Sequence, residues 1–202
     1  MPSTFQRPQS RTDDGSIKLT KIQKNQALGI GDIKMSKKKK IQKTLVEKIL
    51  DKEKVTYEPM TFETEADGDT QELVTDKNSR DGYKIYKTLV LTGNKTGPLV
   101  GMLPLDKHLS YKKLAKISGN KKVGMVPLKD LVKTSGFEHG ANSPVGIHSL
   151  HNYPIYFSKE ADKAEKIIVS AGKIGQSLLI EPHELAKVVN ASFGDFAVDN
   201  PE

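Results

Sequence analysis

The 202-residue sequence contains no cysteine and no tryptophan. The lack of cysteine excludes disulfide bonds, thiolate metal sites and a cysteine nucleophile. It also agrees with a reducing compartment, and we expect a cytoplasmic protein.

The sequence has no apolar run near the roughly 18 residues that a membrane-spanning helix needs. Its first residues are polar and lack the apolar segment of a signal peptide. Hydrophobic residues make up 36% of the chain and charged residues 28%, which is typical of one globular domain with additional residues at an end. We therefore expect no membrane partner.

Positive charge is concentrated at the start of the chain. Residues 1–54 carry 14 lysines and arginines against 6 acids, whereas residues 55–202 carry 18 against 19. The net charge of +7 therefore does not by itself indicate that the globular part binds nucleic acid. Residues 107–133 nevertheless hold eight lysines and one acid, and form either a solvated lysine face or a surface that faces phosphates.

The chain divides into a polar first segment and a patterned remainder. Residues 1–34 have little periodic apolar content, and Met35 followed by four lysines resembles a natural start. We expect residues 1–34 to be disordered or a non-native extension, and residues 35–202 to form the folded domain.

Strand and helix patterns mix in this domain without regular alternation, which predicts an α+β fold around a mixed or antiparallel sheet. Apolar spacing and capping residues predict helices over about 37–53 (after Ser36), 72–74 and 108–117 (Ser110 as a possible cap), and from Pro127 and Pro182. β-branched and aromatic runs predict strands over 55–62, 83–92, 99–105, 123–126, 153–157, 166–170 and 177–180.

The segment 135–146 contains three glycines and an Asn-Ser-Pro turn between two regular segments. Glycine lets a ligand approach the backbone closely, and such a loop can direct several N–H groups at one oxygen-rich ligand. A plain connection between two elements is the alternative.

Several familiar catalytic patterns are missing. The chain has no Gly-x-Ser-x-Gly elbow and no Gly-x4-Gly-Lys-Ser/Thr loop. His148 and His151 are the only close histidine pair, and no acid at a suitable spacing supports a metal site there. We expect neither a metal nor another cofactor.

Lys87 and Thr88 lie inside an otherwise apolar predicted strand. A lysine on a buried strand face needs a partner or an anionic ligand. The alternative is an edge lysine whose stem packs while its charged end reaches water.

Several segments together resemble one family. These are Lys87-Thr88-Leu89-Val90, Lys121-Lys122-Val123, the stretch from Gly140 to Gly146, the stretch from Ile168 to Gly175, and Glu181-Pro182-His183-Glu184-Leu185-Ala186-Lys187. In this order they resemble the YbaK/EbsC branch of the prolyl-tRNA editing superfamily, the Cys-tRNA(Pro)/Cys-tRNA(Cys) deacylases. The resemblance covers about residues 37–198.

The resemblance implies a curved mixed or antiparallel sheet, barrel-like and surrounded by helices. It implies a free-standing enzyme that removes cysteine from mischarged proline tRNA and acts with prolyl-tRNA synthetase. The aminoacyl ester would be cleaved by attack of the substrate's own thiol, so the protein need not supply a nucleophile.

The family pattern assigns catalytic roles to Lys87, Thr88, Gly140 and Ser170. Lys87 would hold the terminal phosphate or polarise the carbonyl, while Thr88 and Ser170 would position the amino group or ribose. The remaining positions implied are Phe62, Ala141, Ser143, Gly172 and Lys173 for substrate and Lys121 and Lys122 for tRNA.

This chain departs from the family pattern at three places. Phe62 stands where tyrosine is usual, and Gly140-Ala141 and Ala171-Gly172 each stand where Gly-Gly is common. An Ala-tRNA(Pro) deacylase and a non-catalytic module that binds aminoacyl-tRNA or the synthetase are the alternatives. A required substrate thiol separates cysteine from alanine, and turnover separates an enzyme from a binding module.

Overall fold

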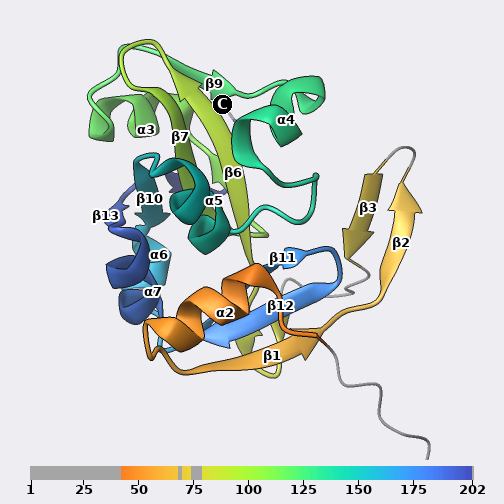
Figure 1. Ribbon diagram of the computed structural model, residues 1–202. Coiled ribbons are helices and arrows are strands. Elements are labelled where there is room, and N and C mark those ends of the chain that lie inside the picture. Colours follow the sequence, from red (N-terminus) through yellow and green to blue (C-terminus); the bar gives the residue numbers. More distant parts are fainter. Residues whose placement is uncertain (1–41, 68–69, 74–78, 202) are drawn as a thin grey trace, which may run out of the picture. The chain divides into compact units, whose positions relative to one another are not determined.

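A computed structural model of the chain describes residues 42–67, 70–73 and 79–201 (Figure 1). The predicted extension over residues 1–34 lies outside these ranges, as do Ser36 and the lysines at 37–40. Gln42–Glu202 group into one compact unit, which is the unit described below.

A five-stranded mixed sheet forms the centre of this unit. Its strand order is β13 (Ser192–Gly194), β10 (Ile155–Ser158), β7 (Gly97–Pro104), β6 (Tyr86–Gly93) and β9 (Val123–Met125). β6 and β7 form the predicted antiparallel hairpin, with Gly93 opposite Gly97. β10 runs parallel to both β7 and β13, whereas β9 is antiparallel to β6.

A second, antiparallel sheet has the order β1 (Tyr57–Thr61), β12 (Gln176–Ile180) and β11 (Ile167–Lys173). It meets the first sheet at a parallel bridge between Ile85 and Ile168. Three further antiparallel pairs are β2 (Thr64–Asp67) with β3 (Thr70–Leu73), β4 (Ser79–Arg80) with β5 (Tyr83–Lys84), and β8 (His108–Leu109) with β14 (Ala197–Val198). The α+β fold with mixed and antiparallel sheets is confirmed, but the described strands form separate sheets and no closed barrel.

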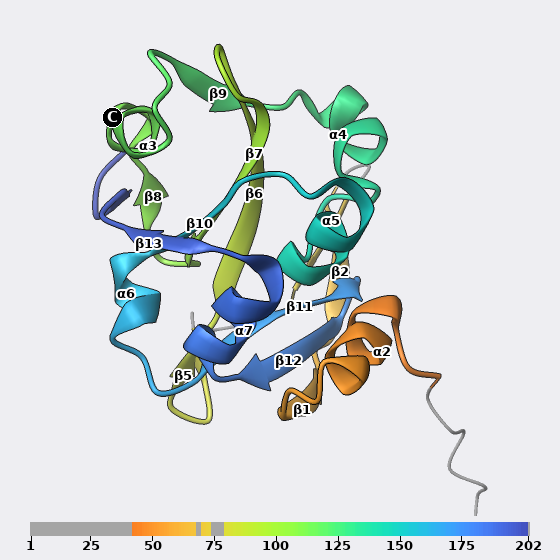
Figure 2. The same cartoon turned by 60° about the vertical axis from the view of Figure 1, so that its left-hand side comes forward.

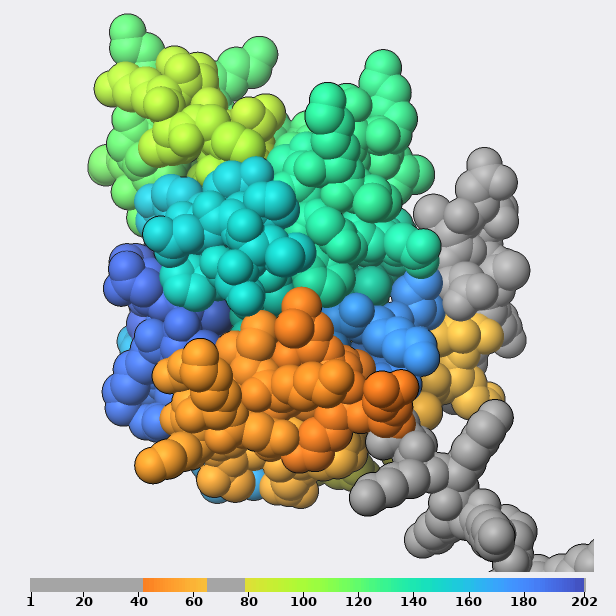
Figure 3. Space-filling model, viewed as in Figure 1, coloured from red at the N-terminus to blue at the C-terminus, as the bar shows by residue number. Residues whose placement is uncertain are grey.

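Helices pack around the sheets (Figure 2). They are α2 (Leu45–Lys52), α3 (Tyr111–Ile117), α4 (Leu128–Ser135), α5 (Pro144–His151), α6 (Lys159–Asp162) and α7 (Pro182–Val189). In the space-filling view α2 covers the front of the second sheet (Figure 3). Among the described residues, no helix is long and apolar enough to cross a membrane.

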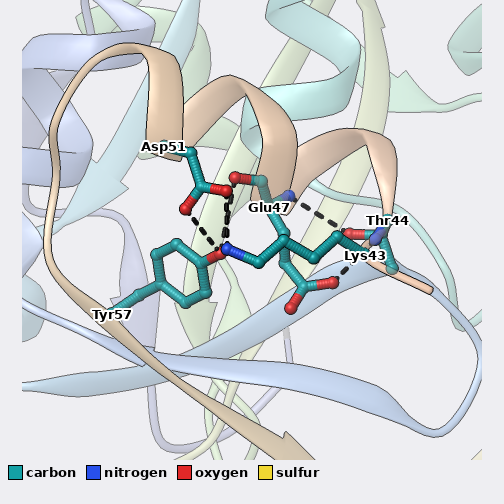
Figure 4. A network of polar contacts seen from close by, with 5 residues as sticks. All are labelled: Lys43, Thr44, Glu47, Asp51 and Tyr57. Atoms are coloured by element: carbon teal, nitrogen blue, oxygen red, sulfur yellow. Dashed lines mark hydrogen bonds and ion pairs between the residues drawn. The ribbon is translucent and has the colours of Figure 1, made fainter. Parts of the chain in front are cut away.

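The first described helix begins later than its apolar pattern predicts, because Thr44 caps it. The Thr44 hydroxyl accepts a hydrogen bond from the Glu47 N–H at 3.2 Å, and the Glu47 carboxylate accepts one from the Thr44 N–H at 2.7 Å (Figure 4). This reciprocal pair satisfies two N–H groups that a helix start otherwise leaves open. Residues 42–44 are therefore outside the helix.

Other element boundaries also differ from the sequence prediction. Residues 72 and 73 belong to strand β3 rather than a helix, because they pair with β2; Val74 lies outside the described residues. α3 begins at Tyr111 after the predicted cap Ser110, because His108 and Leu109 pair with β14. The sequence prediction missed β2, β4, α5, α6, β13 and β14.

The main apolar core lies between the two sheets and the helices α2, α5 and α7. Fully buried members include Val46, Leu50, Phe157 and Leu185. α5 packs so close to the loop before it that a Cβ on Gly146 would lie 2.2 Å from the Phe137 ring. The core therefore fixes the loop of residues 136–143 between α4 and α5, here called the Gly-rich loop, against the sheets.

Candidate functional site

A cavity of about 630 Å³ opens beside β6. Its walls come mainly from four segments distant in sequence: residues 85–90 at the start of β6, the Gly-rich loop, the β11–β12 hairpin, and the stretch from Met125 to Leu131. Leu105 also contributes. Three of the segments that the family resemblance singled out therefore meet at one place.

The pairing of β6 explains why a cavity forms there. β7 pairs with β6 along its whole length, but β9 pairs only with Leu91–Gly93 on the other edge. The edge of residues 86–89 on the β9 side is thus left beside the cavity, with no strand of the described residues paired to it beyond the Ile85–Ile168 bridge.

The backbone groups of Thr88 point to this open edge. The Val90 carbonyl accepts a hydrogen bond from the Val126 N–H on the β9 side, and the Ile85 carbonyl accepts one from the Leu105 N–H on the β7 side. Because backbone groups alternate along a strand, Thr88 faces the same side as Val90. A ligand in the cavity can therefore reach the main chain of Thr88.

Lys87 lines the cavity, and its side chain is half-buried. Its Nζ atom donates a hydrogen bond to the Leu105 carbonyl at 3.2 Å. Burial lowers the pKa of this ammonium below its ordinary value, and the nearby Asp106 carboxylate acts in the opposite direction. An ammonium has three donors, so Lys87 keeps two for a substrate oxygen.

Two oxygen atoms of the cavity residues are buried without a hydrogen-bond partner among the described residues. They are Thr88 Oγ1 and Asn142 Oδ1. A buried polar atom without a partner costs free energy, so both are candidates to bind a ligand. Burial also raises the pKa of Tyr86, another lining residue, and the Glu160 and Asp106 carboxylates add to this effect.

Ser170 ties the β11–β12 sheet to the Gly-rich loop. Its hydroxyl donates to the Ala141 carbonyl at 3.1 Å and accepts from the Gly172 N–H at 3.2 Å. The β11–β12 register shifts between Ser170 and Lys173, and this bulge redirects the strand toward the loop. Because its proton is donated to Ala141, Ser170 is left only as an acceptor for a ligand.

The Gly-rich loop turns at Gly140, which lines the cavity and has a φ of 81°. Glycine adopts this left-handed conformation without strain. The next N–H group, that of Ala141, donates to the Glu138 carbonyl at 3.0 Å, so it is not a free donor for an oxyanion. The loop ends at the N-cap of α5, where Pro144 occupies the first helical position.

Five predicted substrate-binding residues do not line the cavity. Ala141 and Ser143 are buried residues of the Gly-rich loop, and the exposed Lys173 is the last residue of β11. Gly172 instead permits close packing, since a Cβ there would lie 2.9 Å from Val46. Phe62 is buried and donates its N–H to the carbonyl of Gly175, which does line the cavity.

Lys121 and Lys122 do not line the cavity and lie away from Lys87. Their N–H groups donate to the Asn94 side chain at 2.9 and 3.0 Å, and both residues are exposed. They precede Val123, which pairs with Gly93. Six residues of strand separate Gly93 from Lys87, or about 20 Å. These lysines could therefore contact a large ligand but not its reacting end.

The sequence prediction did not single out several residues that line the cavity. The polar ones are His139, Asn142, Gln176 and Ser177, and the apolar ones include Met125 and Leu128. His139 and Asn142 lie within the Gly-rich loop, which was the available signal for them. Nothing in the local pattern of Met125 or Leu128 indicated a cavity, because an apolar residue in a predicted strand or helix most often packs in the core.

The histidine pair of the sequence prediction lies on α5. His151 stacks on Tyr153, with ring centroids 4.8 Å apart. Among the described residues, no three histidine, aspartate or glutamate side chains lie together in a way that could hold a metal ion.

Comparison with known proteins adds three kinds of likeness. A family model described as "Aminoacyl-tRNA editing domain" matches residues 65–188. A protein of Enterococcus faecalis (strain ATCC 700802 / V583), named "Putative Cys-tRNA(Pro)/Cys-tRNA(Cys) deacylase EbsC", is 40% identical over 161 residues, which cover 80% of this chain and 97% of that protein.

Two solved structures share the fold. The crystal structure of the hypothetical protein APE2540 matches with a TM-score of 0.61 and 18% identity, over 76% of this chain and 99% of the other. That of "a putative trans-editing enzyme for prolyl tRNA synthetase" matches with a TM-score of 0.51 and 21% identity, over 56% of this chain and 70% of the other. At these identities the likeness concerns the fold alone.

Proposed function

The chain belongs to the aminoacyl-tRNA editing domain family, and from this membership we propose that it is a deacylase that removes cysteine from mischarged Cys-tRNA(Pro). Cys-tRNA(Cys) is a further substrate under this proposal. The observation that carries it is the meeting of Lys87, Thr88, Gly140 and Ser170 around one cavity in a chain that is 40% identical to a protein named for this activity.

The proposed reaction uses the thiol of the substrate. The cysteine sulfur attacks its own carbonyl carbon, a carbon–sulfur bond forms, and the ester bond to the ribose oxygen breaks. The thiol proton ends on that ribose oxygen, and cysteine leaves as a cyclic thioester. The protein supplies no nucleophile in this step, which suits a chain without cysteine.

The residues of the cavity fit the charges that this reaction creates. Negative charge develops on the carbonyl oxygen, and donors placed at such an oxygen stabilise the transition state. Lys87 has two N–H donors left after its bond to Leu105. The Thr88 main chain at the open edge of β6 offers a further donor beside it.

The amino group of the substrate needs acceptors instead. Ser170 is restricted to accepting by its bond to Ala141, and Asn142 Oδ1 is buried without a partner among the described residues. We assign both to the α-ammonium group. Gly140 provides the turn that precedes Asn142, and both residues line the cavity.

The macromolecular partners follow from the same proposal. The substrate is an aminoacyl-tRNA, and we assign Lys121 and Lys122 to its phosphate backbone, at a distance from the reacting ester. Prolyl-tRNA synthetase, which generates the mischarged substrate, is the proposed protein partner, and residues 35–202 are the proposed editing domain.

A direct test compares Cys-tRNA(Pro) with Ala-tRNA(Pro). Each is incubated with the wild-type protein, with Lys87→Ala, and with Lys187→Ala as a control for loss of a lysine. Lys187 lies on α7, pairs with Glu184 and does not line the cavity. We expect loss of cysteine only, unaffected by Lys187→Ala and reduced by about 100-fold or more in Lys87→Ala.

The other outcomes would each change the proposal. Release of alanine in place of cysteine would assign the chain to alanine editing. Binding of both tRNAs without turnover would indicate a module that captures aminoacyl-tRNA.

A further inference from the structure

An exposed apolar surface adjoins the cavity. Met125, Leu128 and Val132, here called the apolar rim, are 43%, 57% and 54% exposed. The sequence pattern places Leu128, Leu131 and Val132 on one face of their helix, but of these three only Leu131 is buried. Met125 and Leu128 also line the cavity, so the rim continues the wall of the site outward.

The helix α4 carries a second, charged stripe beside the rim. Leu128 and Val132 are four residues apart and share one face, as do Lys129 and Lys133. Successive residues are turned by about 100° around a helix, so the lysine stripe lies next to the apolar one. Both lysines are exposed. Figure 1 shows α4 between β9 and the loop that leads to α5.

The chemistry of the proposed substrate identifies what meets this surface. The aminoacyl ester is attached to a ribose, and the base of the same nucleotide is attached to the other side of that ring. When the ester lies in the cavity, the terminal base must lie at the cavity mouth. The next phosphates then follow directly outside.

We propose that the apolar rim binds the terminal adenosine base of the aminoacyl-tRNA, and that Lys129 and Lys133 bind the adjoining phosphates. This inference rests on the proposed deacylase function. The flat face of the base covers the aliphatic side chains, which supplies the contact that aromatic side chains supply at other single-stranded sites. The lysine stripe contributes a salt-dependent attraction that does not depend on the base.

Two non-hydrolysable analogues separate the rim from the cavity. One carries cysteine in amide linkage on the 3′ position of adenosine, and the other carries it on the same ribose without the base. Their dissociation constants are measured by calorimetry with the wild type and with the double variant Leu128→Ser/Val132→Ser. Leu150→Ser is the matched control, since Leu150 is 51% exposed on α5 and does not line the cavity.

We expect the wild type and Leu150→Ser to bind the adenosine analogue more tightly than the baseless one. In the double variant, affinity for the adenosine analogue should fall by about tenfold, as expected for partial burial of two aliphatic side chains. Affinity for the baseless analogue should not change. Lys129→Gln/Lys133→Gln should leave both constants unchanged and weaken only an analogue extended by two nucleotides.

Equal affinity of the wild type for the two analogues would overturn the proposal that the rim binds the base. An equal loss of affinity for both analogues in the double variant would overturn it as well. If the wild type deacylates Cys-tRNA(Pro) and yet binds both analogues equally, only the rim fails. If it binds the analogues unequally without any turnover, the rim stands and the deacylase fails. If neither analogue binds, the proposal for the rim fails, and turnover of Cys-tRNA(Pro) decides the deacylase separately.

Discussion

The hydroxyl of Ser170 donates a hydrogen bond to the carbonyl oxygen of Ala141 at 3.1 Å, across 29 positions of sequence. This bond joins the bulge of β11 to the Gly-rich loop, and the same hydroxyl accepts the Gly172 N–H. Two walls of the cavity are therefore held together by one side chain.

Replacing Ser170 by alanine should loosen the Gly-rich loop. The Ala141 carbonyl and the Gly172 N–H would both lose this partner, which should lower the free energy of unfolding by about 1–2 kcal/mol. Deacylation should fall further than this loss explains if Ser170 also accepts from the substrate amino group, as proposed. Urea unfolding and steady-state kinetics measure the two effects, and Ser149→Ala on the exposed face of α5 is the control. Unchanged kinetics would remove Ser170 from the site.

Lys87→Met should separate stability from activity. Burial lowers the pKa of Lys87, which means that the folded protein disfavours its charged form. The variant should therefore be at least as stable as the wild type at neutral pH, while deacylation falls by about 100-fold or more. A large loss of stability would instead identify Lys87 as a structural residue.

The lowered pKa of Lys87 also predicts how the free energy of unfolding changes with pH. The pKa of Lys87 is lower in the folded protein than its ordinary value of 10.5. Between these two values the unfolded chain binds more protons, so the free energy of unfolding rises with pH. The wild type should thus gain stability relative to Lys87→Met as the pH rises through this window toward 10.5. A difference between the two proteins that stays constant or falls over this range would contradict the assignment.

Three glycine substitutions test the close packing behind the cavity. Gly172→Ala combines a φ of 81° with a Cβ position 2.9 Å from Val46 and 3.1 Å from Phe137. Gly119→Ala has a φ of 71° but open space, and Gly124→Ala has neither constraint. We expect losses of unfolding free energy of about 3 kcal/mol, about 1 kcal/mol and close to zero, respectively. Equal losses in the first two variants would show that the backbone angle alone matters at Gly172.

Thr44→Ala should weaken α2. Loss of the reciprocal bonds with Glu47 should cost about 1 kcal/mol of unfolding free energy. Lys43 is the matched comparison, because it forms an exposed ion pair with Asp51 in the same network (Figure 4), and its removal should have little effect. Thermal melting of the two variants distinguishes a cap from a surface ion pair, and a larger loss for Lys43→Ala would reverse their roles.

Charge reversal at Lys121 and Lys122 should weaken tRNA binding and flatten its dependence on salt. The control is charge reversal at Lys48 and Lys52, which belong to α2 at the opposite end of the unit from β9 (Figure 1). Binding is measured by filter retention at several salt concentrations. If the two double variants behave alike, the effect is one of net charge and these lysines do not form a binding site.

The sequence by itself determined the α+β class, the main strands and the family. These depend on local patterns and on the order of motifs along the chain, and both can be read without a structure. Lys87 and Thr88 stood out as polar residues in an apolar strand, and Gly140 stood out in a loop of glycine, serine and proline. Thr44 shows the limit of periodicity: the apolar pattern begins before it, but α2 begins only after this capping residue.

Only the tertiary structure decided which of these residues share a cavity. β9 pairs only with the last three residues of β6, which leaves the rest of that edge open. The local sequence of β6 does not indicate where a neighbouring strand ends. Leu128 and Val132 carry the same helical spacing as buried residues, yet nothing among the described elements covers them. Burial depends on what packs against a helix face, which is decided by contacts between segments far apart in the chain.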